Sequence, residues 1–117
     1  MTQTIVTVES GQEIAGSLKV MLNTLHGVDE VLIGRSKLCT VRVEQYVRDI
    51  SRIQTWIWSN HGTAYVRDLN SFGGTTVNGS NGDVRILKGG TDVELIDGDT
   101  IIIGEERKLV LKVEVIE

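Results

Sequence analysis

Apolar residues recur along the chain at alternate positions or in short continuous runs, with polar residues and glycines between the runs. Each run has the length of a β-strand, and most are bounded by Gly, Asn, Asp or Ser, which favour tight turns. Residues 78–83, Asn-Gly-Ser-Asn-Gly-Asp, are an example of turn chemistry that tolerates positive φ. The predicted strands are 4–8, 17–22, 30–33, 41–43, 55–58, 63–69, 75–77, 84–87, 92–95, 100–103 and 108–116. Short strands separated by such turns predict an all-β protein and favour a β-sandwich.

One segment allows a second interpretation. Leu18, Met21, Leu22 and Leu25 follow helical spacing, so a helical turn competes with the strand predicted there. No internal repeat or Pro- and Ser-rich linker divides the chain, and 117 residues suit one domain of ordinary size. We therefore expect a single domain over residues 1–117.

The composition is that of a globular protein, with 40% apolar and 24% charged residues. A single cysteine, Cys39, cannot form an internal disulfide, which is typical of a reducing compartment, and we expect it to be a small buried apolar residue. The chain lacks the features of a signal peptide and any run of about 20 apolar residues, so we expect a cytoplasmic protein with no membrane partner. The net charge of −4 argues against a nucleic-acid partner.

Enzymatic chemistry finds little support in the sequence. The two histidines, His26 and His61, have no recognisable catalytic neighbours, and His61 lies in a predicted hairpin turn. The acidic residues of 92–99 lack the ligand spacing of an EF-hand loop, and no Cys/His cluster suits zinc. Residues 73–75, Gly-Gly-Thr, are not a P-loop because no Lys follows the glycines. We therefore expect no enzyme, no metal and no cofactor.

The two tryptophans occupy one strand. Trp56 and Trp58 lie two residues apart and so point to the same face, opposite Thr55 and Ile57. They either cover one layer of the sandwich or form an exposed aromatic contact surface for a partner. Both interpretations stay open at this point.

Four ordered segments carry a family resemblance. Residues 34–36 read Gly-Arg-Ser, and residues 51–54 read Ser-Arg-Ile-Gln. Residues 68–79 read Asp-Leu-Asn-Ser-Phe-Gly-Gly-Thr-Thr-Val-Asn-Gly, and residues 95–104 read Leu-Ile-Asp-Gly-Asp-Thr-Ile-Ile-Ile-Gly. In this order and spacing, over about residues 31–113, they resemble the forkhead-associated (FHA) family. The resemblance implies an FHA/SMAD-like β-sandwich of about eleven strands, with binding loops for phosphothreonine peptides at one end.

The resemblance also implies which residues meet the ligand. Arg35 and Ser51 correspond to residues that contact the phosphate, and Arg52 lies beside them. The loop that contains Phe72 and Gly73 corresponds to the one that contacts the phosphate and the peptide backbone. These residue types suit the task, because a phosphothreonine carries almost two negative charges and needs an Arg and neutral donors on a rigid scaffold.

Other positions correspond to supporting and selecting residues. Gln54 replaces a structural His that holds the loops, and an amide can also donate and accept. We expect Ser71, Thr75 and Asn78 to support the loops as well. Asp49 lies two residues before Ser51, where FHA domains select the residue three after the phosphothreonine, and a carboxylate there should repel acidic residues.

Two further departures concern the ligand. Gly73 replaces an Asn that bonds the peptide backbone, and Phe72 takes a position often held by a polar residue. We expect the loop to accept Gly73→Asn and the new amide to strengthen binding by about the net value of one hydrogen bond, roughly 0.5–1.5 kcal/mol.

The charge distribution favours an anionic ligand at the motif segments. Residues 34–52 hold five basic and two acidic residues, a net charge of +3, so the rest of a chain with net charge −4 carries −7. We therefore expect a phosphothreonine-dependent module that binds a threonine-phosphorylated protein or peptide in signalling or assembly. The alternative is an FHA-like scaffold that binds a protein partner without phosphate, through Phe72, Trp56 and Trp58.

Overall fold

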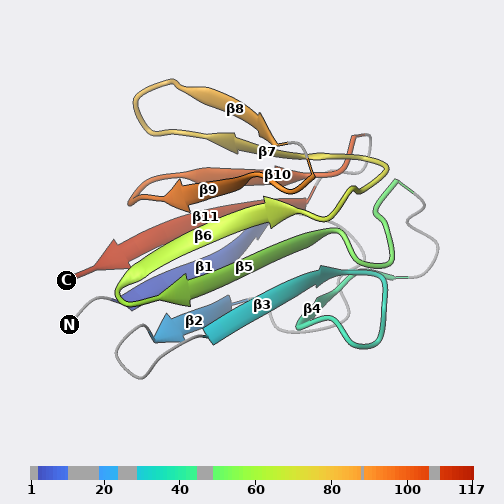
Figure 1. Ribbon diagram of the computed structural model, residues 1–117, viewed down its shortest axis with the longest axis horizontal. Helices are drawn as coiled ribbons and strands as arrows, with labels where there is room; N and C mark the ends of the chain where they lie inside the picture. The colour runs from blue at the N-terminus through green and yellow to red at the C-terminus, as the bar shows by residue number, and fades with distance from the viewer. Residues whose placement is uncertain (1–2, 11–18, 24–28, 45–48, 88, 106–108) are drawn as a thin grey trace.

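The computed structural model describes residues 3–10, 19–23, 29–44, 49–87, 89–105 and 109–117. Within these residues the chain forms eleven β-strands (Figure 1). In chain order they are β1 (Gln3–Ser10), β2 (Lys19–Asn23), β3 (Asp29–Gly34), β4 (Val41–Arg42), β5 (Thr55–Asn60), β6 (Thr63–Asp68), β7 (Thr75–Asn78), β8 (Val84–Leu87), β9 (Asp92–Leu95), β10 (Thr100–Ile103) and β11 (Leu109–Ile116). In the same residues no helix is present that could cross a membrane.

The strands form the two layers of a β-sandwich. One sheet has the order β2-β1-β11-β10-β7-β8, and the other has the order β4-β3-β5-β6-β9. All neighbours are antiparallel except β3 and β4, which pair in parallel. Figure 1 shows the β3–β4, β4–β5 and β6–β7 loops at one end of the molecule and both termini at the other.

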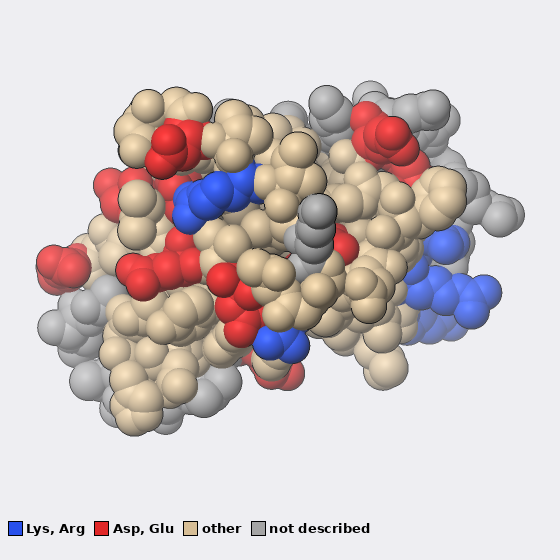
Figure 2. Space-filling model, turned by 45° about the horizontal axis from the view of Figure 1, so that its top comes forward, with Lys and Arg blue, Asp and Glu red and all other residues tan. Residues whose placement is uncertain are grey.

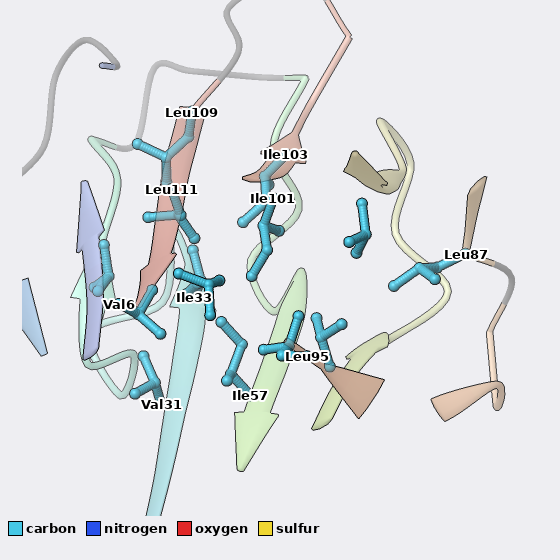
Figure 3. Close-up of a cluster of buried hydrophobic side chains, with 14 of the residues drawn as sticks. Val6, Val31, Ile33, Ile57, Leu87, Leu95, Ile101, Ile103, Leu109 and Leu111 are labelled. Atoms are coloured by element: carbon cyan, nitrogen blue, oxygen red, sulfur yellow. The ribbon is translucent and has the colours of Figure 1, made fainter. Parts of the chain in front are cut away.

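The core lies between the two sheets. Alternate residues of each strand point inward, as in β5, where Thr55 and Ile57 are buried while Trp56 and Trp58 lie half-buried on the outer face. Ile57 packs in the same cluster as residues from both sheets, among them Ile33, Ile101 and Leu111 (Figure 3). Full burial of one such side chain contributes about 1.5–3 kcal/mol. The core therefore gives the end loops a stable scaffold.

The predicted strands agree with the observed ones to within a few residues. The helical alternative at 18–25 is wrong for Lys19–Asn23, which pair with β1 as strand β2. The remaining residues of that segment lie outside the described residues, as does His26. Cys39 is buried as expected, and burial raises the pKa of its thiol.

The β5–β6 hairpin shows how the turn residues act. Asn60 pairs with Thr63, and the two residues between them, His61 and Gly62, both have positive φ, at 49° and 88°. Two positive φ values are the requirement of a type I′ turn, whose twist matches the flanking strands. His61 is exposed there, as the turn prediction required.

Candidate functional site

Backbone hydrogen bonds bring the first two motif segments together at the loop end. Arg35 N donates to Ser51 O at 3.1 Å, and Ser36 N donates to Arg52 O at 2.9 Å. Gly34 makes this crossing possible, because a Cβ at that position would overlap Arg52 O and come within 3.0 Å of Ser51 O. The Gly before Arg35 is therefore a packing requirement of the site.

The Arg35 side chain is held against the β4–β5 loop. Its Nε donates to Ile50 O at 2.5 Å, while the residue remains partly exposed. The guanidinium therefore lies beside the backbone of Ser51. Arg52 follows with an exposed side chain, so the loop end carries two guanidinium groups from adjacent segments.

Ser51 connects the β4–β5 loop to the β6–β7 loop. Its Oγ accepts a hydrogen bond from Phe72 N at 2.9 Å, and a hydroxyl that accepts in this way can still donate its own proton. The Phe72 backbone is thereby fixed, whereas its side chain is 83% exposed. An aromatic ring consequently projects into solvent from a residue whose backbone is bonded to Ser51.

Gln54 links the same two loops through side-chain hydrogen bonds. The side chain is fully buried, at 0% exposure. Its Oε1 accepts from Ser51 N at 2.8 Å, and its Nε2 donates to Ser71 Oγ and to Gly74 O, both at 2.7 Å. The Gln54 side chain therefore makes three hydrogen bonds that reach two loops.

A buried carboxylate completes this network. Asp68 is 4% exposed and accepts from Ser71 N at 3.0 Å, from Ser71 Oγ at 2.5 Å and from Thr75 Oγ1 at 2.7 Å. Because the one Thr75 hydroxyl proton goes to Asp68, the 2.8 Å contact between Thr55 Oγ1 and Thr75 Oγ1 has Thr55 as donor. The β6–β7 loop is thus held by a chain of polar groups within the sandwich.

Sequence reasoning did not assign a role to Asp68 or Thr55. The strand alternation indicated that both side chains are buried. Asp68 falls on the same inward-facing positions of β6 as Ala64 and Val66, and Thr55 falls on the same inward-facing positions of β5 as Ile57. Polar side chains at inward positions must find partners. Which partners they find depends on how β5, β6 and β7 meet.

Gly73 has a different role from the one expected. A Cβ at this position would overlap the carbonyl oxygen of Asp49 and lie 3.1 Å from Cα of Gly104. The expectation that the loop accepts Gly73→Asn is therefore wrong, because the first side-chain atom already meets backbone. Positive φ in this loop falls instead on Asn70, at 53°, and Gly74, at 83°.

The remaining predicted residues lie at the edges of the site. Asp49 accepts a hydrogen bond from Glu105 N at 3.3 Å through Oδ2, so its carboxylate is turned toward the β10–β11 connection. Asn78 ends β7 and pairs with Val84, three residues beyond Thr75 and next to the β7–β8 hairpin. The structure does not bring Asn78 to the loop end.

The loop end combines positive charge with open space. Figure 2 shows Lys and Arg side chains gathered at this end, whereas most Asp and Glu side chains of the visible face lie elsewhere. An open cleft of about 450 Å³ is lined by residues of the β6–β7 loop, among them Phe72 and Gly73, and by Leu87 and Glu105. Over the described residues, His, Cys, Asp and Glu side chains do not gather in threes as a metal site would need.

Comparison with known proteins identifies the family. A family model for the FHA domain matches residues 31–104, which is more than half of the chain. The chain therefore belongs to the FHA family, whose members are protein-interaction modules rather than enzymes. The comparison with curated proteins gave no match.

Solved FHA structures share the fold. One, from work on phosphothreonine-dependent FHA domain interactions, is 26% identical with a TM-score of 0.65, over 96% of this chain and 95% of that chain. The N-terminal FHA domain of S. cerevisiae Rad53p, bound to a phosphothreonine peptide, is 20% identical with a TM-score of 0.71, over 97% and 93%. The FhaA FHA domain, in complex with the intracellular domain of Rv3910, is 23% identical with a TM-score of 0.64, over 95% and 99%.

Proposed function

We propose that this FHA domain binds a threonine-phosphorylated segment of a partner protein and that Arg35 and Ser51 hold the phosphate. The observation that carries the proposal is the bond from Arg35 Nε to Ile50 O, which holds the guanidinium beside Ser51. A phosphothreonine brings a charge of about −1.5 to −2 and three acceptor oxygens. A guanidinium, a hydroxyl and the nearby exposed Arg52 offer donors and positive charge for these oxygens.

The proposed site is organised before a ligand arrives. The hydrogen bonds of Gln54, Ser51 and Asp68 link the β4–β5 loop to the β6–β7 loop and fix both to the sandwich. A ligand that meets fixed donors loses less affinity to the ordering of loops. The N-terminal FHA domain of Rad53p, which shares this fold, is bound to a phosphothreonine peptide, and this supports a phosphothreonine ligand here.

A second candidate function uses the same loops without phosphate. The 83% exposed Phe72 ring and the absence of a side chain at Gly73 favour an apolar contact in place of a polar one. In that case a partner would cover Phe72, and Arg35 would have a minor part.

Matched peptides distinguish the two candidates. Libraries of phosphothreonine peptides and the same peptides with unmodified threonine are titrated against the domain and its Arg35→Ala variant, with binding followed by fluorescence anisotropy. We expect binding that requires the phosphate and is abolished by Arg35→Ala. Lys112→Ala, at an exposed position of β11, is the control for loss of one positive charge.

Equal affinity for both libraries, with loss of binding in Phe72→Ala, would favour the second candidate. Circular dichroism checks the fold of Arg35→Ala, and we expect the variant to be folded because Arg35 lies outside the hydrophobic core cluster.

A further inference from the structure

A second distinctive surface lies on the outer face of the five-stranded sheet. Strand register places its outward side chains in two rows across β3, β5, β6 and β9. One row consists of Glu30, Trp58, Tyr65 and Glu94, and the other consists of Leu32, Trp56, Arg67 and Asp92. We call these eight residues the aromatic face.

The rings of the aromatic face are stacked. The ring centroids of Trp56 and Trp58 lie 4.2 Å apart, and those of Trp58 and Tyr65 lie 5.5 Å apart, with interplanar angles of 24° and 26°. The indole Nε1 of Trp56 donates to Glu30 Oε2 at 3.3 Å. All three aromatic residues keep part of their surface exposed, so the stack is a rigid, accessible platform.

The platform already accommodates one cation from its own chain. The Cζ atom of Arg67 lies 5.6 Å from the Trp56 centroid and 5.5 Å from the Trp58 centroid. Asp92 holds this guanidinium through two bonds, from Nε at 2.6 Å and from Nη2 at 3.0 Å. The geometry shows that a guanidinium fits against these rings.

The charge of the aromatic face is negative. Its three carboxylates and one guanidinium give a net charge of −2, and the Arg67–Asp92 pair is internally neutral. Glu30 and Glu94 remain at the two ends of the row that contains Trp58 and Tyr65, and both are exposed. An aromatic centre between two carboxylates is complementary to a basic chain and repels an acidic one.

We propose that the aromatic face is a second docking surface, which binds an extended basic segment of a protein partner independently of the phosphate site. Three strand spacings separate Glu30 from Glu94, about 14 Å. An extended chain covers that distance in about four residues. The segment that fits best therefore carries two Lys or Arg residues four positions apart, with apolar or hydroxyl side chains over the rings between them.

Intrinsic fluorescence reports directly on this surface, because the chain has two tryptophans and both belong to the aromatic face. The probe is the peptide Gly-Lys-Thr-Val-Thr-Lys-Gly, and its counterpart has Glu in place of both Lys. We expect the basic peptide to change tryptophan emission in a saturable, salt-sensitive manner and the acidic peptide to have no effect. Failure of the basic peptide to bind would refute the proposal.

Charge removal tests the site. The double variant Glu30→Gln, Glu94→Gln should weaken basic-peptide binding about fivefold, since exposed ion pairs contribute about 0.5 kcal/mol each. Glu114→Gln, at an exposed position of β11 in the other sheet, is the matched control and should bind as the wild type does.

The phosphate site is tested separately. The double variant should keep its phosphopeptide affinity, and Arg35→Ala should keep its basic-peptide affinity. Unchanged basic-peptide binding in the double variant, or an equal loss in Glu114→Gln, would overturn the assignment.

Discussion

Replacement of Gln54 by Leu removes the polar support of the binding loops while leaving a side chain of similar size in the core. Gln54 is fully buried and makes three hydrogen bonds, to Ser51 N, Ser71 Oγ and Gly74 O. In Gln54→Leu the Ser51 amide loses its partner, whereas the Gly74 carbonyl keeps its bond from Gly104 N at 3.1 Å and Ser71 keeps its bond to Asp68.

The expected cost follows from the one group left without a partner, the Ser51 amide. A partly buried backbone group deprived of its hydrogen bond costs about 1–3 kcal/mol, so the free energy of unfolding should fall by about 2 kcal/mol. At a urea dependence of about 1.5 kcal/mol/M for a domain of this size, the midpoint should move about 1.3 M lower.

Urea denaturation followed by tryptophan emission measures this shift, because Trp56 and Trp58 lie on β5, which begins directly after Gln54. Gln54→His is the comparison, since an imidazole keeps one acceptor and one donor and should cost only about 1 kcal/mol, the value of one hydrogen bond. A Gln54→Leu midpoint within about 0.5 M of the wild type, less than 1 kcal/mol, would refute the reasoning. It would mean that the loop backbone finds water in place of Gln54.

Two further changes test the neighbouring groups. Ser71→Ala and Thr75→Val should each lower the free energy of unfolding by about 1–2 kcal/mol, because both hydroxyls donate to the buried Asp68. Calorimetry measures the shift, and unchanged melting temperatures would show that these groups are solvated. Asp49 should make the domain prefer Lys or Arg over Asp or Glu three residues after the phosphothreonine, and Asp49→Asn should weaken that preference about threefold. A peptide array that shows a preference for acidic residues at that position would contradict the assignment.

Much of the fold could be predicted because its signals are local. Alternation of apolar residues located the strands, and residues such as Asn60, His61 and Gly62 marked the turns between them. The same alternation placed Trp56 and Trp58 on one face. That Tyr65 completes their stack depends on the register between β5 and β6, which no local pattern contains.

The candidate site could be predicted in part for the same reason. Motif spacing assigned Arg35 and Ser51, and the structure brings their segments together. The partners of Asp68 could not be predicted, because they depend on how three strands and a loop meet. The close approach of Gly73 to Asp49 likewise joins loops that are 24 residues apart in the chain.

That close approach reverses the effect expected of a side chain at Gly73. In Gly73→Asn the Cβ meets the Asp49 carbonyl, which is backbone and cannot rotate away as a side chain would. The loop must move, and because Phe72 N is bonded to Ser51 Oγ, the movement reaches the proposed phosphate site. We expect a loss of about 1–3 kcal/mol in stability, the usual cost of overpacking, together with weaker phosphopeptide binding.

Gly73→Ala separates the two properties of the Asn side chain. It adds the same Cβ without an amide, so equal losses in both variants would assign the effect to the overlap with Asp49. Thermal unfolding and titration of one phosphopeptide against wild type and both variants measure the two effects. Stronger binding by Gly73→Asn with unchanged stability would show that the Asp49 segment moves aside easily. In that case the missing amide, and not the packing of the loops, would limit the affinity of the wild-type domain.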